Sequence, residues 1–175
     1  MIQTKNLTLK PVTQNDLSLF QDLLSCPTFT RYLPKERPYR DEEIRDYLLN
    51  RVEHWKKGFG TFTVIETQTN QKVGYAGVEI LQDKTKSDIR FGILQSKKGM
   101  GYGQEAAKAC LTYTFSLGQH NVIYGAAMSD NIASIKTLCR LGLRKRQDLA
   151  LYDCGELSYF SIHKTIASLD SDNPL

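Results

Sequence analysis

The chain has 175 residues, of which 41% are hydrophobic and 24% are charged. This composition is typical of one soluble domain that buries its own core without disulfides or metals. The net charge is +4 and the basic residues are scattered, which disfavours a nucleic-acid partner, and no run of about 18 apolar residues is present to cross a membrane. We therefore predict one cytoplasmic domain over residues 1–166 and a polar, disordered tail over 167–175, without a nucleic-acid or membrane partner.

The first half of the chain predicts a strand followed by two helices. Residues 7–12 alternate as a strand, and Thr13 is placed to cap a helix over 14–25. Residues 26–39 carry three of the five prolines and are expected to be irregular. A second helix is predicted over 40–58, because it opens with acidic residues and closes with lysines and a glycine.

The second half alternates strands and helices. The patterns predict strands over residues 60–67, 72–81, 88–94, 121–128, 143–152 and 156–164, with helices over 103–118 and 130–142. This order is typical of an α/β (α+β) domain in which helices cover a mixed sheet.

The four cysteines argue against a metal site. Cys26, Cys110, Cys139 and Cys154 form no Cys-x-x-Cys pair, and the histidines do not cluster with them. We expect no metal ion, and reduced thiols suit a cytoplasmic protein. Cys110 and Cys139 fall inside helical patterns, which predicts that both are buried.

A glycine-rich segment, "SKKGMGYGQEAA", precedes the helix over 103–118. A Walker loop requires Gly-Lys-Ser/Thr, but Gly103 is followed by Gln104. The dinucleotide fingerprint Gly-x-Gly-x-x-Gly does not fit Gly99-x-Gly101-x-Gly103 either. Free amides at a helix start form an anion site, so the segment is either such a site or a tight turn with no ligand.

Several motifs together resemble the GNAT N-acetyltransferases, most closely the ribosomal-protein N-acetyltransferase (RimJ/RimL) branch. They are the strand "DIRFGIL", the glycine loop, the Asn-x-x-Ser of residues 131–134 and the Leu-Gly-Leu of residues 141–143. The loop matches the family's Gln/Arg-x-x-Gly-x-Gly/Ala, with Lys98 at the first position. The resemblance covers almost the whole chain. It implies the GNAT fold, with a mostly antiparallel seven-stranded sheet, about four helices and two strands that splay apart at the cofactor site.

The resemblance also implies acetyl-CoA as co-substrate, with its pyrophosphate on the glycine loop. Ile93 and Leu94 would contact it through their main chain, and an amide near Phe91 or Ile93 would serve as oxyanion donor. The implied cofactor-binding residues are Ile93, Leu94, Lys98, Gly99, Met100, Gly101, Tyr102, Gly103, Gln104, Asn131 and Ser134.

The catalytic side chains are less directly indicated. A general base would deprotonate the amine, and Asp88, Glu79 and Asp153 are candidates, although each could equally be a solvated carboxylate. Many relatives carry a tyrosine acid where this chain has Leu138, which leaves Ser134 as the group near the sulfur. Asn131 and Ser134 also fit a simple helix cap.

These expectations together describe an acetyl-CoA-dependent N-acetyltransferase in which a primary amine attacks directly in a ternary complex. The amine would be a protein N-terminus or a small molecule, and the protein a monomer or homodimer. Two alternatives are a non-catalytic acyl-CoA-binding sensor on the same fold and a nucleotide-binding enzyme that uses the loop for ATP. The acceptor groove is expected from residues 26–39 and the C-terminal strands.

Overall fold

A computed structural model describes residues 1–82, 84–152 and 156–164. Its elements are β1 (Ile2–Gln3), β2 (Leu7–Pro11), α1 (Leu17–Leu24), α2 (Pro27–Thr30), α3 (Asp41–His54), β3 (Thr61–Glu66), β4 (Gln71–Ile80), β5 (Ser87–Ile93), α4 (Tyr102–Ser116), β6 (Val122–Met128), α5 (Ile132–Arg140), β7 (Arg144–Arg146) and β8 (Leu157–His163). Asp153, Cys154 and the predicted tail over 167–175 lie outside the described residues.

The strands form one mixed sheet in the order β1-β2-β3-β4-β5-β6-β8-β7. Among the described strands only the β5–β6 pair is parallel, which confirms the predicted mostly antiparallel fold. The described sheet has eight strands rather than seven, because Ile2 and Gln3 add a short edge strand against β2. Two residues are too few to show an alternating pattern in the sequence. The segment predicted to be irregular also contains α2, which begins at Pro27.

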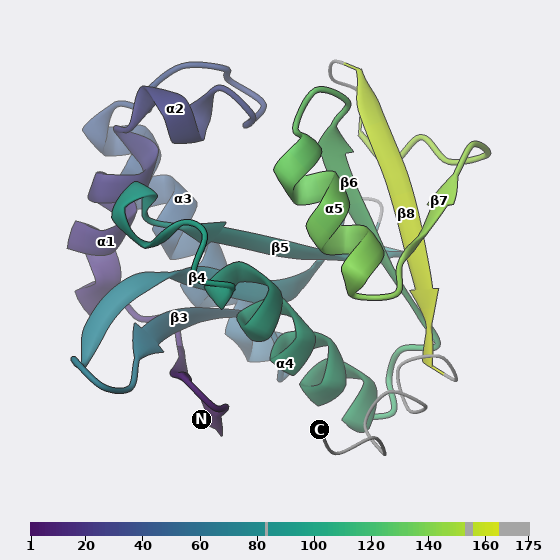
Figure 1. Ribbon diagram of the computed structural model, residues 1–175, viewed down its shortest axis with the longest axis horizontal. Coiled ribbons are helices and arrows are strands. Elements are labelled where there is room, and N and C mark those ends of the chain that lie inside the picture. Colours follow the sequence, from purple (N-terminus) through teal and green to yellow (C-terminus); the bar gives the residue numbers. More distant parts are fainter. Residues whose placement is uncertain (83, 153–155, 165–175) are drawn as a thin grey trace.

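Helices cover both faces of the sheet. Helices α4 and α5 pack on one face, and α1 and α3 pack on the other (Figure 1). On α4 the buried positions include Ala106, Cys110 and Leu111, spaced as one helical stripe. Ile44 and Leu48 of α3 lie four residues apart and face the apolar cluster that α1 and α3 form on their side of the sheet. The predicted end of this helix is confirmed, since Gly58 adopts φ +85° after a short 3-10 turn.

The cysteine predictions are half correct. Cys110 is fully buried under α4, as predicted. The prediction for Cys139 is wrong, because this thiol is exposed. Helix α5 buries one stripe through Leu138, and the next residue is rotated about 100° away toward solvent.

Strands β5 and β6 separate almost as soon as they meet. They share one pair, Asp88 with Tyr124, whereas β4 and β5 remain paired from Ser87 to Ile93. The C-terminal half of β5 therefore has a partner on one side only. This is the splay that the resemblance implied.

Two features concern partners. None of the described helices combines the length and the apolar character needed to span a bilayer. Over residues 1–82, 84–152 and 156–164, no group of His, Cys, Asp or Glu side chains is arranged to hold a metal ion.

Candidate active site

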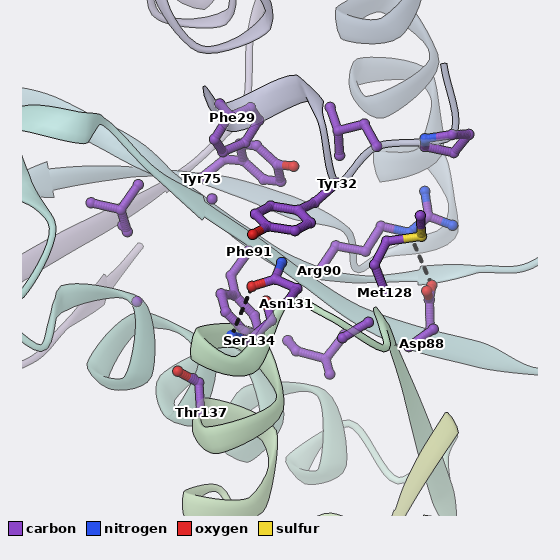
Figure 2. A pocket seen from close by; sticks show the side chains of 18 of the residues that line it. Phe29, Tyr32, Tyr75, Asp88, Arg90, Phe91, Met128, Asn131, Ser134 and Thr137 are labelled. Carbon is purple, nitrogen blue, oxygen red and sulfur yellow. Dashed lines mark hydrogen bonds and ion pairs between the residues drawn. The ribbon is translucent and has the colours of Figure 1, made fainter. Parts of the chain in front are cut away.

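A cavity of about 2130 Å³ opens where β5 and β6 separate. Its walls come from α2 and the segment after it, α3, β5, the glycine loop, the start of α5 and residues 150–152. Figure 2 shows Phe29, Tyr32 and Tyr75 on one side of it and Ser134 and Thr137 on the other. Proline-rich residues 26–39 thus supply part of the wall, as the sequence suggested.

The cavity brings together most of the predicted cofactor residues. Those that line it are Ile93, Lys98, Gly99, Gly101, Tyr102, Gly103, Gln104, Asn131 and Ser134. Leu94 and Met100 are outside the lining, and the Met100 side chain is 52% exposed. Asp88 and Glu79 also line the cavity.

The glycine loop needs its glycines for backbone conformation. Gly99 and Gly101 adopt φ +83° and +80°, and a Cβ on either would meet no atom within 4 Å. Gly101 caps α4, so helix geometry leaves the N–H groups of Tyr102, Gly103 and Gln104 without intrahelical partners. Because the positive end of the helix dipole lies at the same place, the loop can bind an anion such as a diphosphate.

The Glu66 carboxylate holds this loop in place through hydrogen bonds from side chains on both sides of it. Its carboxylate accepts hydrogen bonds from Thr69, from the Tyr102 hydroxyl at 2.6 Å and from Lys97 Nζ at 2.9 Å. These bonds lower the pKa of Glu66 to about 2, with the Thr69 bond contributing most. Lys97 is therefore committed to Glu66, while Lys98 remains exposed on the cavity wall.

We expect Glu66→Gln to lower the free energy of unfolding at pH 7. The folded pKa of about 2 lies below the ordinary value of 4.5, so this stability is present above pH 4.5 and is lost as the pH falls toward 2. Urea denaturation at pH 7 and pH 2.5 tests this. The gap between wild type and variant should narrow at the lower pH, and an equal gap at both would contradict the assignment.

The open edge of β5 presents main-chain groups to the cavity. The Leu94 N–H, just after β5, donates to the carbonyl of Val73 on β4 at 2.8 Å. Since hydrogen-bonding direction alternates along a strand, the N–H and C=O groups of Phe91 and Ile93 point toward β6, where pairing has ended. Of the two main-chain contacts implied by the resemblance, Ile93 faces the open edge and Leu94 faces β4.

Asn131 and Ser134 lie at the start of α5. The Ser134 N–H donates to Asn131 Oδ1 at 3.2 Å, so Asn131 is a helix cap as well as a cavity residue (Figure 2). Leu138, one turn further, is 1% exposed and packs in the core. The position that carries a tyrosine acid in many relatives is therefore an apolar packing site here.

A buried cluster of charges forms the cavity floor. The Asp88 carboxylate, 3% exposed, accepts from Arg90 Nε at 3.0 Å and from the Tyr152 hydroxyl. Glu79, 6% exposed, accepts from Arg90 Nη1 at 3.0 Å and from Thr61 Oγ1 at 2.6 Å. Figure 2 shows Arg90 extended along the cavity toward Asp88.

The two carboxylates in this cluster differ in their affinity for a proton. Burial raises the pKa of Asp88, and the opposing effects of Arg90 and Tyr152 do not cancel it. For Glu79 burial acts in the same direction, but Arg51 and Arg90 outweigh it and the pKa is lowered. Asp88 is therefore the carboxylate of the pair that accepts a proton more readily.

Three residues of this cluster were not singled out from the sequence. Arg51 stands at a buried position of α3, in register with Ile44 and Leu48, and a charge on an apolar stripe is a detectable signal. Arg90 shares a face of β5 with Asp88, two residues away. Tyr152 lies between strands, and no local pattern marks it.

Comparisons with known proteins agree with this fold. Residues 6–144 match the family described as "Acetyltransferase (GNAT) domain". The uncharacterized protein YkkB of Bacillus subtilis is 29% identical over 92 residues, which are 50% of this chain and 54% of that protein. The matched region thus spans about half of that curated relative.

Solved structures share the fold at low sequence identity. An acetyltransferase from Agrobacterium tumefaciens has a TM-score of 0.81, with 20% identity over 93% of each chain. A spermidine N-acetyltransferase from Vibrio cholerae, solved with CoA and spermine, has 0.76, with 17% identity over 94% of this chain and 99% of that one. A Salmonella typhimurium enzyme that modifies the N-terminal serine of ribosomal protein L7/L12 has 0.74, with 16% identity over 91% and 96%. The family match covers most of the chain, and the chain belongs to the GNAT acetyltransferase family.

Proposed function

We propose that the protein transfers an acetyl group from acetyl-CoA to a primary amine, by direct attack in a ternary complex. One observation supports this most strongly. The unpaired edge of β5 runs directly into a glycine loop at the start of α4, inside one cavity. A single ligand with a peptide-like arm and a diphosphate would satisfy both features.

The chain's own groups fit the parts of such a ligand. The amides at Gly101–Gln104 would hold the diphosphate, with Lys98 adding a solvent-screened contact. The main chain of Ile93 would pair with the pantetheine arm, and an N–H of Phe91 or Ile93 would donate to the acetyl oxygen. Acetyl-CoA supplies the thioester whose acetyl group is transferred.

Asp88 is our proposed general base and Ser134 the hydroxyl nearest the sulfur. The amine nitrogen bonds to the acetyl carbon, the carbon–sulfur bond breaks, and the thiolate leaves. The amine gives up one proton, which Asp88 accepts directly or through water, and Ser134 stabilises the departing sulfur. Asp153, the other predicted carboxylate, lies outside the described residues.

Protein N-termini and small amines are both proposed acceptor classes. The structural neighbours named above include one enzyme of each kind. The experiment is release of free thiol from acetyl-CoA with a panel of amines and peptide N-termini, with products identified by mass spectrometry. Binding of acetyl-CoA without turnover of any acceptor would favour the sensor alternative. Thermal stabilisation by ATP but not by CoA would overturn the proposal.

We expect Ser134→Ala to lower kcat roughly tenfold, because one hydrogen bond to the departing sulfur is lost. The dissociation constant for acetyl-CoA should change little, since the main-chain N–H that Asn131 caps is retained. Thr137→Val is the matched control, because Thr137 lines the same wall but its hydroxyl already donates to Ala133 O at 2.9 Å. Steady-state kinetics and calorimetry separate the effects, and equal losses in both variants would remove Ser134 from the site.

A further inference from the structure

The cavity wall contains a buried guanidinium that its surroundings do not satisfy. Arg51 is 5% exposed and lines the cavity from α3. Its Nη1 donates to the Tyr47 carbonyl at 3.0 Å. Its Nε is buried and has no hydrogen-bond partner within the described part of the chain. A guanidinium group has five N–H donors, and the Nε donor of Arg51 is buried without a partner among the described residues.

The nearest carboxylate does not satisfy these donors. Arg51 Nε lies 3.8 Å from Glu79 Oε1, which is beyond hydrogen-bond distance. That oxygen already accepts from Thr61 at 2.6 Å, and the other oxygen of Glu79 accepts from Arg90 at 3.0 Å. The Arg51 charge is therefore partly balanced, but Glu79 accepts no hydrogen bond from its Nε.

Arg90 provides the contrast within the same cluster. Its Nε, Nη1 and Nη2 donate to Asp88, Glu79 and Tyr152 at 3.0, 3.0 and 3.3 Å. All three nitrogen atoms of the Arg90 guanidinium therefore have hydrogen-bond partners within the protein. Arg51 instead stacks one face on the Tyr47 ring, with 3.4 Å between its central carbon and the ring centroid. Stacking engages the face of the guanidinium and not its N–H groups, and a guanidinium matches a carboxylate in geometry and charge.

We propose that Arg51 binds the carboxylate of the acceptor, so that the preferred acceptor carries an amine and a carboxylate in one molecule. The inference rests on the proposed acetyl transfer and specifies its substrate class. The charge balance of the floor supports it. Two guanidiniums, Arg51 and Arg90, face two carboxylates, Glu79 and Asp88. An ammonium alone would add an uncompensated charge to this buried cluster, whereas an ammonium with a carboxylate adds none.

The first test compares acceptors on the wild-type protein. Amino acids with increasing separation of the two groups, from glycine to 6-aminohexanoate, are each paired with the corresponding carboxamide. The amine of each carboxamide is no more basic than the amine of the corresponding acid, so at the assay pH at least as much of it is unprotonated. A preference for the acid must therefore come from binding of its carboxylate. We expect kcat/KM for the best acid to exceed that of its amide by about 30-fold or more, as for a hydrogen-bonded charge. Equal values across the series, or a preference for spermidine, would overturn the inference.

The second test replaces Arg51, the residue that we propose as the anchor for the acceptor carboxylate. Arg51→Met keeps the length and packing of the side chain but removes the guanidinium. We expect the ratio of acid to amide turnover to fall to near one, while KM for acetyl-CoA stays within about twofold of wild type. An unchanged ratio in the variant would assign Arg51 a purely structural role.

A third measurement guards against misfolding of Arg51→Met, which leaves Glu79 with one cation fewer. The double variant Arg51→Met/Glu79→Gln removes both charges of the 3.8 Å pair and restores neutrality, and it should show the same loss of acid preference. On the wild type, the carboxylic acid that lacks the amine should inhibit competitively with the acceptor. Failure to inhibit would count against the anchor. Turnover of spermidine or of a peptide N-terminus without turnover of any acid or amide would overturn the inference alone, whereas no turnover with any acceptor would overturn the proposed function as well.

Discussion

Replacement of Gly101 by aspartate should abolish measurable binding of acetyl-CoA. The new carboxylate would stand where α4 begins, beside the amides at Tyr102 and Gly103 that are left free for an anion. Two like charges 4 Å apart at an effective dielectric constant of about 20 repel by roughly 4 kcal/mol, which is close to a thousandfold in affinity. Isothermal titration calorimetry with CoA and with acetyl-CoA measures the loss.

Gly101→Asn is the matched control for this change. Gly101 adopts φ +80°, a conformation in which aspartate and asparagine are both tolerated better than other side chains. A Cβ atom at this position would meet no atom within 4 Å, so there is room for the Cβ of either residue. Asparagine therefore reproduces the backbone strain without the charge, and we expect it to weaken binding about tenfold or less. If both variants lost binding equally, strain rather than the anion site would explain the effect.

The part of the cavity proposed to hold the cofactor is built from the main chain, and its loop and helix start could therefore be predicted from the sequence. The glycines at 99 and 101 mark left-handed backbone, and the helix after them fixes the direction of the free amides. Both signals are local and survive without knowledge of the sheet. The separation of β5 from β6 is not local, and the sequence indicated it only through the resemblance.

The acceptor half could not be predicted in the same way, because side chains from distant elements build it. Asp88 on β5, Glu79 on β4 and Arg51 on α3 meet only through the pairing of strands and the packing of a helix. Tyr152 reaches Asp88 across 64 positions of the chain. An arginine on an apolar helix face is a usable clue, whereas a tyrosine in a connecting segment is not.

The two halves also divide the chemistry. In the proposed function, main-chain groups bind parts of acetyl-CoA that do not vary, so a loop and a strand edge are sufficient for that task. Acceptors differ between enzymes of one fold, and in our proposal recognition of the acceptor falls to the charged side chain of Arg51. The neighbours that act on a ribosomal protein and on spermidine share this fold at under 25% identity.

The second large effect is expected at Asp88. Asp88→Asn keeps the size of the side chain but cannot accept a proton, so we expect kcat to fall by about 10² to 10⁴. Binding of acetyl-CoA should be unchanged, because the loop and the β5 edge are intact. Release of free thiol from acetyl-CoA gives the rate. The midpoint of thermal unfolding reports whether the variant keeps the stability that the buried cluster with Arg90 provides. A loss smaller than threefold in a folded variant would make Asp88 a structural ion-pair partner instead.

The pH profile distinguishes a base from a merely buried acid. A base must be unprotonated, so kcat should fall as the pH drops through the pKa of Asp88, which burial holds above its ordinary value of 3.8. Tyr152 donates to this carboxylate and thereby stabilises the charged form. Tyr152→Phe should therefore raise the pKa and move the acid limb to higher pH, with the plateau rate little changed. Glu79, Arg51 and His54 also face the cluster, and all three are the same residues in the wild type and in the Tyr152→Phe variant. Both proteins are assayed with the same acceptor, so the titration of the amine is the same in both profiles. An acid limb at the same pH in both proteins would show that Asp88 does not carry the proton.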